Sequence, residues 1–188
     1  MKRDSFLEYA LLFAVAVVVV LLVQAFVVKP YRIPSPSMVG TLEPGDRILA
    51  SRLAYHFGDP QRGDVIVFHY PLDRSLEYIK RVVGTPGDTL SLVDGQVYRN
   101  GVLLNEPYVH VVDGLPEPTS VLHEPGISGV AEPWSLNAPY TVPDDQYFVM
   151  GDHRLQSEDS RAWGTVARGD IIGRAFVIFW PLGRAETL

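Results

Sequence analysis

The sequence contains no cysteine among its 188 residues. Disulfides, thiol nucleophiles and cysteine-ligated zinc are therefore excluded, whereas the redox compartment is left open. A chain of this length forms one hydrophobic core, or one core with a small appended lobe.

Positive charge is scarce in this sequence. Lysine and arginine number 16 against 22 aspartates and glutamates, which gives a formal net charge of -6 at pH 7. Proteins that bind nucleic acids usually present a basic face, and no run of like charge suggests an interaction tail. We therefore expect no nucleic-acid partner.

Motifs for metals and phosphates are also lacking. The histidines have no His-x3-His spacing, and there is neither a Gly-x-Ser-x-Gly elbow nor a phosphate-binding loop. We expect no metal site and no cofactor, so a nucleophilic enzyme would have to activate Ser, Thr or Lys by other means. The histidines are His56, His69, His110, His123 and His153.

One long apolar run is present, from residue 6 to residue 28, with Glu8 and Gln24 as its polar members. As a helix it would extend about 34 Å, which exceeds the roughly 30 Å of a bilayer's hydrocarbon core. We expect one N-terminal transmembrane helix here, after a short cytoplasmic N-terminus at residues 1–5.

Two other interpretations of this run stay open. A buried core helix would usually be shorter and would alternate with polar residues. A cleavable signal peptide could end at Val23-Gln24-Ala25, although the run is long for that purpose. Flanking charge does not set the orientation, because two basic residues precede the run and Lys29 and Arg32 follow it.

Short apolar or alternating stretches after Pro30 predict β-strands. The pair Asp94-Gly95, between the stretches 89–93 and 96–99, is a signal for a two-residue hairpin. No helix beyond the anchor is predicted. The other predicted strands span residues 65–68, 78–83, 147–150 and 171–180.

The fold that we expect is mostly β, with an antiparallel β-sheet catalytic core. The core comprises residues 29–105 and 143–188. Residues 106–142 are rich in proline and poor in periodic apolar runs, so we expect a loop-rich lobe inserted between the two halves of the core.

The dipeptide Gly-Asp recurs before apolar stretches, and we interpret most of its occurrences as turns. Glycine reaches positive φ, and we expect the aspartate to bond the backbone two residues later. Examples are Gly45-Asp46, Gly63-Asp64 and Gly87-Asp88.

Four segments in a fixed order stand out behind the apolar run. Residues 33–38 read IPSPSM, residues 62–68 read RGDVIVF, residues 78–84 read YIKRVVG and residues 151–164 read GDHRLQSEDSRAWG. Together they resemble the bacterial type I signal peptidases, a serine/lysine-dyad family that removes signal peptides from exported proteins. The resemblance covers most of the chain.

The resemblance implies a nucleophile, a base and two supporting hydroxyls. Ser37 matches the nucleophile and Lys80 the general base. Ser35 matches the hydroxyl that joins the Ser37 amide in the oxyanion hole, and Ser157 matches the serine that positions the lysine amine.

The resemblance also implies an ion pair, Asp159 with Arg161, that braces the site. On an extended segment these two side chains would face the same side, which suits a local brace. A surface pair of little energetic value is the alternative. Asp152 and Arg81 are expected to join the same network.

The residues around Lys80 are compatible with a role as base. A lysine accepts a proton only when its amine is neutral, and this requires burial. Val82 and Val83 suit such burial, as does Ile79, although strand alternation places Ile79 on the opposite face. The alternative is an exposed lysine at a sheet edge.

The sequence departs from the family pattern at three positions. Pro36 stands where a small residue is usual, Gly40 where proline is usual, and His153 where asparagine is common. None of them holds a catalytic role, but they leave undefined the shape of the loop that carries Ser35 and Ser37, the serine loop.

The family's substrate pockets accept small side chains at the first and third residues before the cut, so we expect cleavage after Ala-x-Ala sequences. The expected partners are signal peptides of preproteins and the lipid bilayer, with the catalytic domain on the extracytoplasmic side of the plasma membrane. The sequence does not predict the oligomeric state. The positions expected to bind substrate are Tyr31, Ile33, Pro34, Met38, Leu42, Tyr78 and Ile79.

Two rival functions remain. One is a specialised serine/lysine peptidase, such as a pilin processor or a self-cleaving regulator. The other is an anchored β domain that binds a partner without catalysis, which loss of Ser37 or Lys80 would have indicated.

Overall fold

The computed structural model describes residues 8–18, 20, 27–56, 58–120 and 139–188. Residues 8–18 are helical. Among the residues described, no helix is long and apolar enough to cross a membrane. The rest of the predicted transmembrane anchor, Val23-Gln24-Ala25 included, lies outside these ranges, as do residues 121–138 of the predicted inserted lobe.

The described residues from Val28 onward form three antiparallel sheets, which confirms the prediction of a mostly antiparallel β fold. The large sheet has the strand order β1-β2-β13-β3-β4-β11-β12, with β14 paired to β13. Its strands are β1 (Val28–Arg32), β2 (Arg47–Ser51), β3 (Val65–Tyr70), β4 (Asp73–Gly84), β11 (Gln146–Met150), β12 (Val166–Ala167), β13 (Ile171–Trp180) and β14 (Glu186–Thr187).

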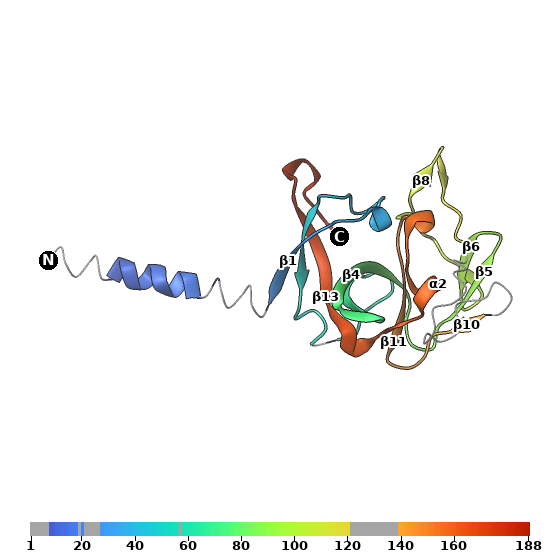
Figure 1. Ribbon diagram of the computed structural model, residues 1–188, viewed down its shortest axis with the longest axis horizontal. Coiled ribbons are helices and arrows are strands. Elements are labelled where there is room, and N and C mark those ends of the chain that lie inside the picture. The colour runs from blue at the N-terminus through green and yellow to red at the C-terminus, as the bar shows by residue number, and fades with distance from the viewer. Residues whose placement is uncertain (1–7, 19, 21–26, 57, 121–138) are drawn as a thin grey trace.

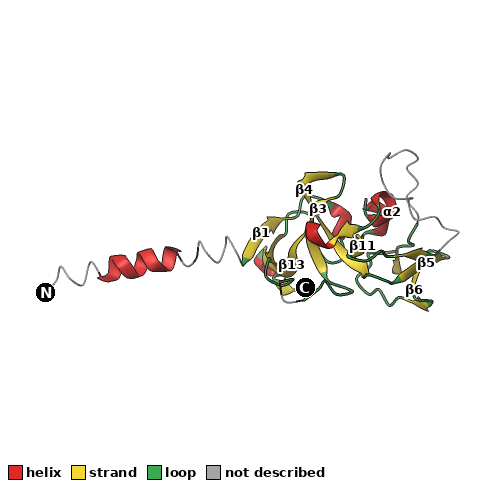
Figure 2. Cartoon of the chain, turned by 90° about the horizontal axis from the view of Figure 1, so that it is seen from below, coloured by secondary structure: helices red, strands yellow, loops and turns green. Residues whose placement is uncertain are grey.

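The two smaller sheets come from the middle of the chain. A four-stranded sheet has the order β10-β5-β6-β7, and it lies beyond β11, at the end of the large sheet away from β1 (Figures 1 and 2). A two-stranded hairpin, β8 with β9, projects beside it. Their strands are β5 (Thr89–Val93), β6 (Gln96–Arg99), β7 (Val102–Leu103), β8 (Val111–Val112), β9 (Leu115–Pro116) and β10 (Tyr140–Thr141).

Among the described residues from 27 onward, the helical segments are short. One is an α-helix, α2 (Ser160–Trp163), in a segment for which the sequence predicted no helix. The others are 3₁₀-helices: η1 (Pro36–Met38), η2 (Arg154–Gln156), η3 (Arg168–Asp170) and η4 (Leu182–Arg184).

Strand β1 forms one edge of the large sheet and contains Pro30. A proline has no N–H to donate, so it is tolerated in an edge strand. Pairing of β1 with β2 places Tyr31 opposite Ile48 and leads the chain directly into the segment that carries Ser37.

The apolar faces of these strands form three buried clusters, and each buried large side chain in them contributes about 1.5–3 kcal/mol. One is centred on Phe68 and Trp163, the second on Leu90 and Phe148, and the third on Met38 and Ile178. Strand β4 contributes to all three, because Val82 packs in the first, Val83 in the second and Ile79 against the third. Its position among the three clusters fixes the backbone on either side of Lys80.

The Gly-Asp turns differ from the expected hydrogen-bond pattern. Asp46, Asp64 and Asp88 accept from the backbone N–H three residues earlier, not two residues later. The chain folds back across the intervening glycine, which has a φ of 81° at Gly87, so the carboxylate reaches the start of its own turn.

The aspartate of each of these turns also forms an ion pair with an arginine from another part of the chain. Asp46 pairs with Arg184, Asp64 with Arg174, and Asp88 with Arg62. Asp88 is the most heavily bonded, because Arg62 Nε at 2.9 Å, Asn100 Nδ2 at 2.8 Å and both donors of Thr85 reach its carboxylate. Burial alone would raise its pKa, but these hydrogen bonds outweigh burial and lower the pKa of Asp88 to about 2.

We predict that Asp88→Asn lowers the free energy of unfolding by about 1–3 kcal/mol at pH 7, because a buried acceptor of several hydrogen bonds loses its charge. The pKa in the unfolded chain is near 3.9, so this stabilisation is complete above that pH and disappears as the pH falls towards 2. Denaturant titrations of both proteins should show a stability difference that shrinks between pH 5 and pH 2. Asp94→Asn, at an exposed turn residue, is the control and should be nearly neutral; an equal loss in both variants would contradict the role given to Asp88.

Candidate active site

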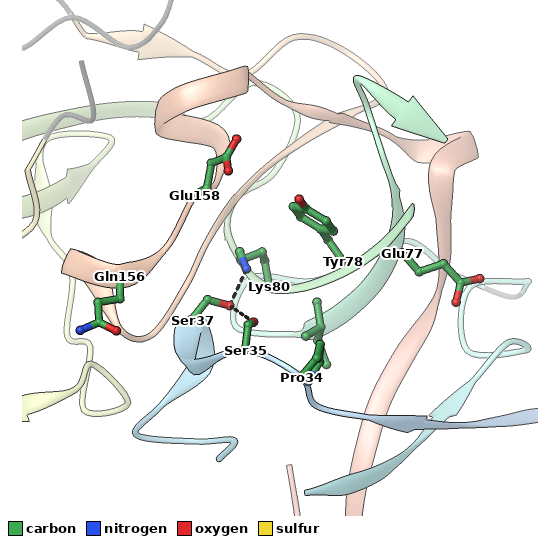
Figure 3. A pocket seen from close by; sticks show the side chains of 9 residues that line it. Pro34, Ser35, Ser37, Glu77, Tyr78, Lys80, Gln156 and Glu158 are labelled. Carbon is green, nitrogen blue, oxygen red and sulfur yellow. Dashed lines mark hydrogen bonds between the residues drawn. The ribbon is translucent and has the colours of Figure 1, made fainter. Parts of the chain in front are cut away.

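The structure brings Ser37 and Lys80 together. Ser37 lies in η1 and Lys80 lies in the middle of β4. Lys80 Nζ donates a hydrogen bond to Ser37 Oγ at 2.7 Å, and the two residues are only 4% and 6% exposed, respectively (Figure 3). A nucleophile and a base in such contact are the minimum for activating a hydroxyl.

The surroundings of Lys80 disfavour its charged form. The residue pairs with Ile66 of β3 and is buried. Burial lowers the pKa of Lys80 to about 8, against the attraction of nearby carboxylates, of which Asp159 acts most strongly. Arg161 acts in the same direction as burial.

The serine loop begins with Ser35, the residue before η1. Its Oγ lies 3.4 Å from Ser37 Oγ. Pro36 occupies the first turn of the 3₁₀-helix, where a backbone N–H would have no partner within the helix. The unusual proline is therefore compatible with the 3₁₀ geometry of the segment that carries Ser37.

The other two departures from the family pattern lie against the same loop. His153 donates its backbone N–H to Ser37 O at 3.2 Å, and its Nδ1 lies 3.2 Å from Pro36 O. Gly40 has a φ of 106°, and a Cβ there would lie 2.8 Å from the carbonyl oxygen of Tyr108. Gly40 thus allows the segment before β8 to approach the serine loop.

Asp159 and Arg161 form a fully buried ion pair, not a surface pair. Arg161 Nε and one terminal nitrogen each lie 2.8 Å from a carboxylate oxygen of Asp159, and both side chains are 0% exposed. The segment is helical rather than extended as expected: Asp159 caps α2 by accepting from the Arg161 amide. The local contact arises from the cap geometry and not from strand alternation.

Ser157 is joined to this pair. Its hydroxyl donates to Asp159 Oδ2 at 2.7 Å, and the Gly151 amide donates to the same oxygen at 2.9 Å. A Cβ on Gly151 would collide with both the Ser157 side chain and the Ser37 carbonyl oxygen. Gly151, just after the end of β11, therefore lies directly between the serine loop and the Asp159–Arg161 ion pair.

Arg81 and Asp152 form a second ion pair, near the Asp159–Arg161 pair. Two guanidinium nitrogens of Arg81 reach Asp152 at 2.9 and 2.7 Å, and Thr41 bonds both partners. Asp152 connects to the Asp159 pair through the backbone of Gly151. Both ion pairs thus fix the backbone at the end of β11, which faces Ser37.

A cleft of about 310 Å³ opens at Ser37 and Lys80. Three of the seven predicted substrate-binding residues line it: Pro34, Tyr78 and Ile79. Glu77, Gln156 and Glu158 also line it, and sequence reasoning did not single them out (Figure 3). Gln156 and Glu158 lie within the 151–164 motif, and this position in the sequence could have indicated that they are near the cleft.

The other four predicted substrate-binding residues lie elsewhere. Ile33, Met38 and Leu42 are at most 2% exposed, in the cluster that supports the serine loop, and Tyr31 packs against that cluster. Their predicted contact with substrate stays a prediction.

A serine hydroxyl held by a buried amine on a β-sheet scaffold fits the class of serine hydrolases in which lysine replaces histidine. Comparisons with known proteins bear on this class. The family model described as "Signal peptidase, peptidase S26" matches residues 6–180.

Several relatives are similar over nearly the whole chain. A probable signal peptidase I-1 of Synechocystis sp. is 41% identical, over 92% of this chain and 82% of that protein. Signal peptidase I of Leptolyngbya laminosa is 38% identical, over 100% and 86%. A crystal structure of a signal peptidase I from Enterococcus faecalis is 34% identical, with a TM-score of 0.47, over 62% of this chain and 96% of that chain.

The chain therefore belongs to the signal peptidase family, peptidase S26. As a member of this family it is a serine endopeptidase.

We predict that Asp159→Asn lowers the free energy of unfolding by about 3–5 kcal/mol, because it strands the fully buried charge of Arg161. Denaturant unfolding should show this loss. The matched control is Asp59→Asn, whose carboxylate pairs with Arg168 at 3.1 Å but is 74% exposed, and this change should cost less than about 1 kcal/mol. Equal costs for the two variants would contradict a structural role for the buried pair.

Proposed function

We propose that this chain removes N-terminal signal peptides from exported preproteins, with Ser37 as nucleophile and Lys80 as general base. The observation that carries the proposal is the 2.7 Å contact between Lys80 Nζ and Ser37 Oγ, within a cleft of a signal peptidase family member. The serine alone is a poor nucleophile at neutral pH, so the amine beside it is the source of its reactivity.

The lowered pKa supports Lys80 in this role. With a pKa of about 8, about one tenth of the amines are neutral at pH 7, against about one in 2,500 at the ordinary value near 10.4. Burial thus increases the reactive fraction by about two orders of magnitude, and the corresponding free energy is about 3 kcal/mol. A pKa near the working pH is also the favourable range for a general base.

The reaction follows from this geometry. The neutral amine accepts the Ser37 proton while Oγ attacks the carbonyl carbon before the cut. The resulting ammonium then gives that proton to the leaving amine, which releases the mature protein and leaves an acyl ester on Ser37. The amine next takes a proton from a water molecule while the water oxygen attacks the carbonyl carbon of the ester. The ammonium returns that proton to Ser37 Oγ as the C–Oγ bond breaks, which releases the signal peptide as a carboxyl product and restores Ser37 and the neutral amine.

The oxyanion of each tetrahedral intermediate requires donors beside Ser37. We assign the Ser37 amide, in the first turn of η1, and the Ser35 hydroxyl to this role. Amides of a first helical turn have no acceptor within the helix, and the Ser35 hydroxyl lies 3.4 Å from Ser37 Oγ.

Ser157, Asp159 and Arg161 act as positioning residues in this proposal. Because Ser157 donates its proton to Asp159, its oxygen lone pairs are available to a protonated Lys80 amine. Arg161 neutralises Asp159, so the carboxylate orients Ser157 without restoring the ordinary pKa of Lys80.

The substrate binds as an added strand along β4. β11 pairs with β4 from Arg81 onward, whereas residues 77–80 pair only with β3 in the described part of the chain. The free edge of residues 77–80 therefore lines the cleft, and an extended peptide can use its backbone groups. Tyr78 and Ile79 narrow this cleft, which favours small side chains such as those of Ala-x-Ala.

The apolar run at residues 6–28 anchors the enzyme in the plasma membrane in this proposal. Its length in the sequence is sufficient for a span, and the substrate's signal peptide is itself membrane-embedded. The catalytic domain then lies on the extracytoplasmic side, where preproteins emerge.

We predict that Lys80→Arg abolishes cleavage of a purified preprotein, as measured by mass spectrometry of the products, because guanidinium stays protonated. Lys80→Met and Ser37→Ala should be equally inactive yet folded. Lys29→Arg makes the same change at a lysine whose side chain is 38% exposed, and because arginine can keep the ion pair with Glu77, this variant should remain active. Near-normal cleavage by Lys80→Arg would contradict the serine/lysine mechanism.

We also predict that replacing the substrate alanine just before the cut with phenylalanine lowers kcat/KM at least a hundredfold, because the cleft is narrow. Replacing the residue two positions before the cut, which an Ala-x-Ala site leaves unspecified, is the control and should have little effect. Undiminished cleavage of the phenylalanine substrate would disprove the assigned specificity.

The proposed topology predicts that protease added to intact spheroplasts digests the chain after Pro30. A cytoplasmic marker protein in the same sample should survive, which shows that the membranes are sealed. Protection of the domain until the spheroplasts are lysed would place it on the cytoplasmic side.

A further inference from the structure

Three metal-type ligands gather outside the cleft: His110, Glu117 and His153. One ligand atom from each lies within 4.8 Å of the others. His110 directly precedes β8, Glu117 directly follows β9, and His153 precedes η2. The β8–β9 hairpin brings His110 and Glu117 together, because the Glu117 amide donates to His110 O at 2.9 Å. The His110 amide donates to Asp152 O at 2.9 Å, which places His110 beside the residue that precedes His153.

The ring of His153 is oriented as a metal ligand would be. Its Nδ1 lies 3.2 Å from Pro36 O, and a carbonyl oxygen accepts only from a protonated nitrogen, so Nδ1 carries hydrogen. Metal-binding histidines usually donate their second ring N–H to a carbonyl or carboxylate in this way. The other nitrogen, Nε2, is then the one that faces the cluster.

Nε2 of His153 lies 3.1 Å from Glu117 Oε1. In a neutral imidazole this contact would bring a nitrogen lone pair against a carboxylate in a site where Glu117 and His153 are 6% and 8% exposed. Such a contact requires either a hydrogen shared between the two atoms or a cation bound by both groups.

The remaining ligands are also held in place. The Leu155 amide donates to Glu117 Oε2 at 3.3 Å, which leaves Oε1 directed at the cluster. The His110 ring lies 4.6 Å from the His153 ring, centre to centre, and His110 is only partly buried. The partly exposed His110 leaves a route for an ion to enter.

We propose that His110, Glu117 and His153 bind a Zn²⁺ ion. Two imidazoles and one carboxylate are a typical three-residue zinc set, which leaves a fourth position for water. Zinc–nitrogen and zinc–oxygen bonds of about 2.0–2.1 Å give tetrahedral ligand separations of about 3.3 Å, close to the 3.1 Å between His153 and Glu117. The ligand atom of His110 lies within 4.8 Å of the other two, so its side chain rotates towards them when the ion binds.

The bound ion connects the β8–β9 hairpin to the serine loop. His153 holds the carbonyls of both Pro36 and Ser37, so fixing its ring also fixes the backbone of the nucleophile. The metal site does not depend on the proposed function, because it is defined by residues outside the cleft.

The test uses the full chain, purified in detergent without a polyhistidine tag and treated with a chelator. We expect calorimetric titration with Zn²⁺ to give one ion per chain, and Co²⁺ to give the visible absorption of a tetrahedral site. A hundredfold excess of Zn²⁺ over its Kd should raise Tm by several degrees. None of these measurements requires peptidase activity.

The ligand variants are His110→Ala, Glu117→Gln and His153→Asn. Each should weaken Zn²⁺ binding at least tenfold and remove the Co²⁺ spectrum. The matched control is His69→Asn, because His69 lies outside the cluster and bonds the backbone of Arg74, and it should bind as the wild type does. No stoichiometric binding, or binding that the ligand variants leave unchanged, would overturn the proposal and leave a proton shared by His153 and Glu117 as the occupant.

Discussion

The exclusion of water from the Lys80 amine is the constraint on which the site depends. A lysine at its ordinary pKa carries a proton at neutral pH and accepts none from a serine. The amine is buried because β4 contributes to three apolar clusters, which leave Lys80 only 4% exposed. Strand pairing, core packing and the buried ion pair thus serve one local condition at Lys80.

Burial alone would not suffice if the surrounding carboxylates were unopposed. Asp159, Glu158 and Asp152 all favour the ammonium form of Lys80. Arg161 and Arg81 pair with two of these carboxylates, and Arg161 itself opposes protonation of Lys80. The ion pairs therefore hold the hydroxyl of Ser157 and the end of β11 in place while the amine keeps a low pKa.

Much of this fold could be predicted from local patterns, since alternation located the long strands and Asp94-Gly95 located the β5–β6 hairpin. The helix α2 was missed because four residues are too few for a helical period, and its start depends on the Asp159 cap. Local patterns also did not reveal that Met38 and Leu42, which were expected to bind substrate, are buried. Their burial is set by tertiary packing under the serine loop. The approach of His153 to Glu117 depends on how the β8–β9 hairpin packs, which single-sequence spacing does not encode.

The measurement that tests this account most directly is the pKa of the Lys80 amine, followed by NMR in a chain labelled with ¹³C at lysine Cε. The sequence has three lysines, and Lys80→Met identifies the signal. We expect Lys80 to titrate near pH 8, and kcat/KM to rise with pH through the same value, because the neutral amine is the active form. Lys29 is an internal reference: burial is the largest single influence and lowers its pKa, but the interactions with Glu77 and Tyr31 together outweigh burial and raise the pKa above the ordinary value. A Lys80 signal that titrates with the ordinary pKa of an exposed lysine would contradict the account.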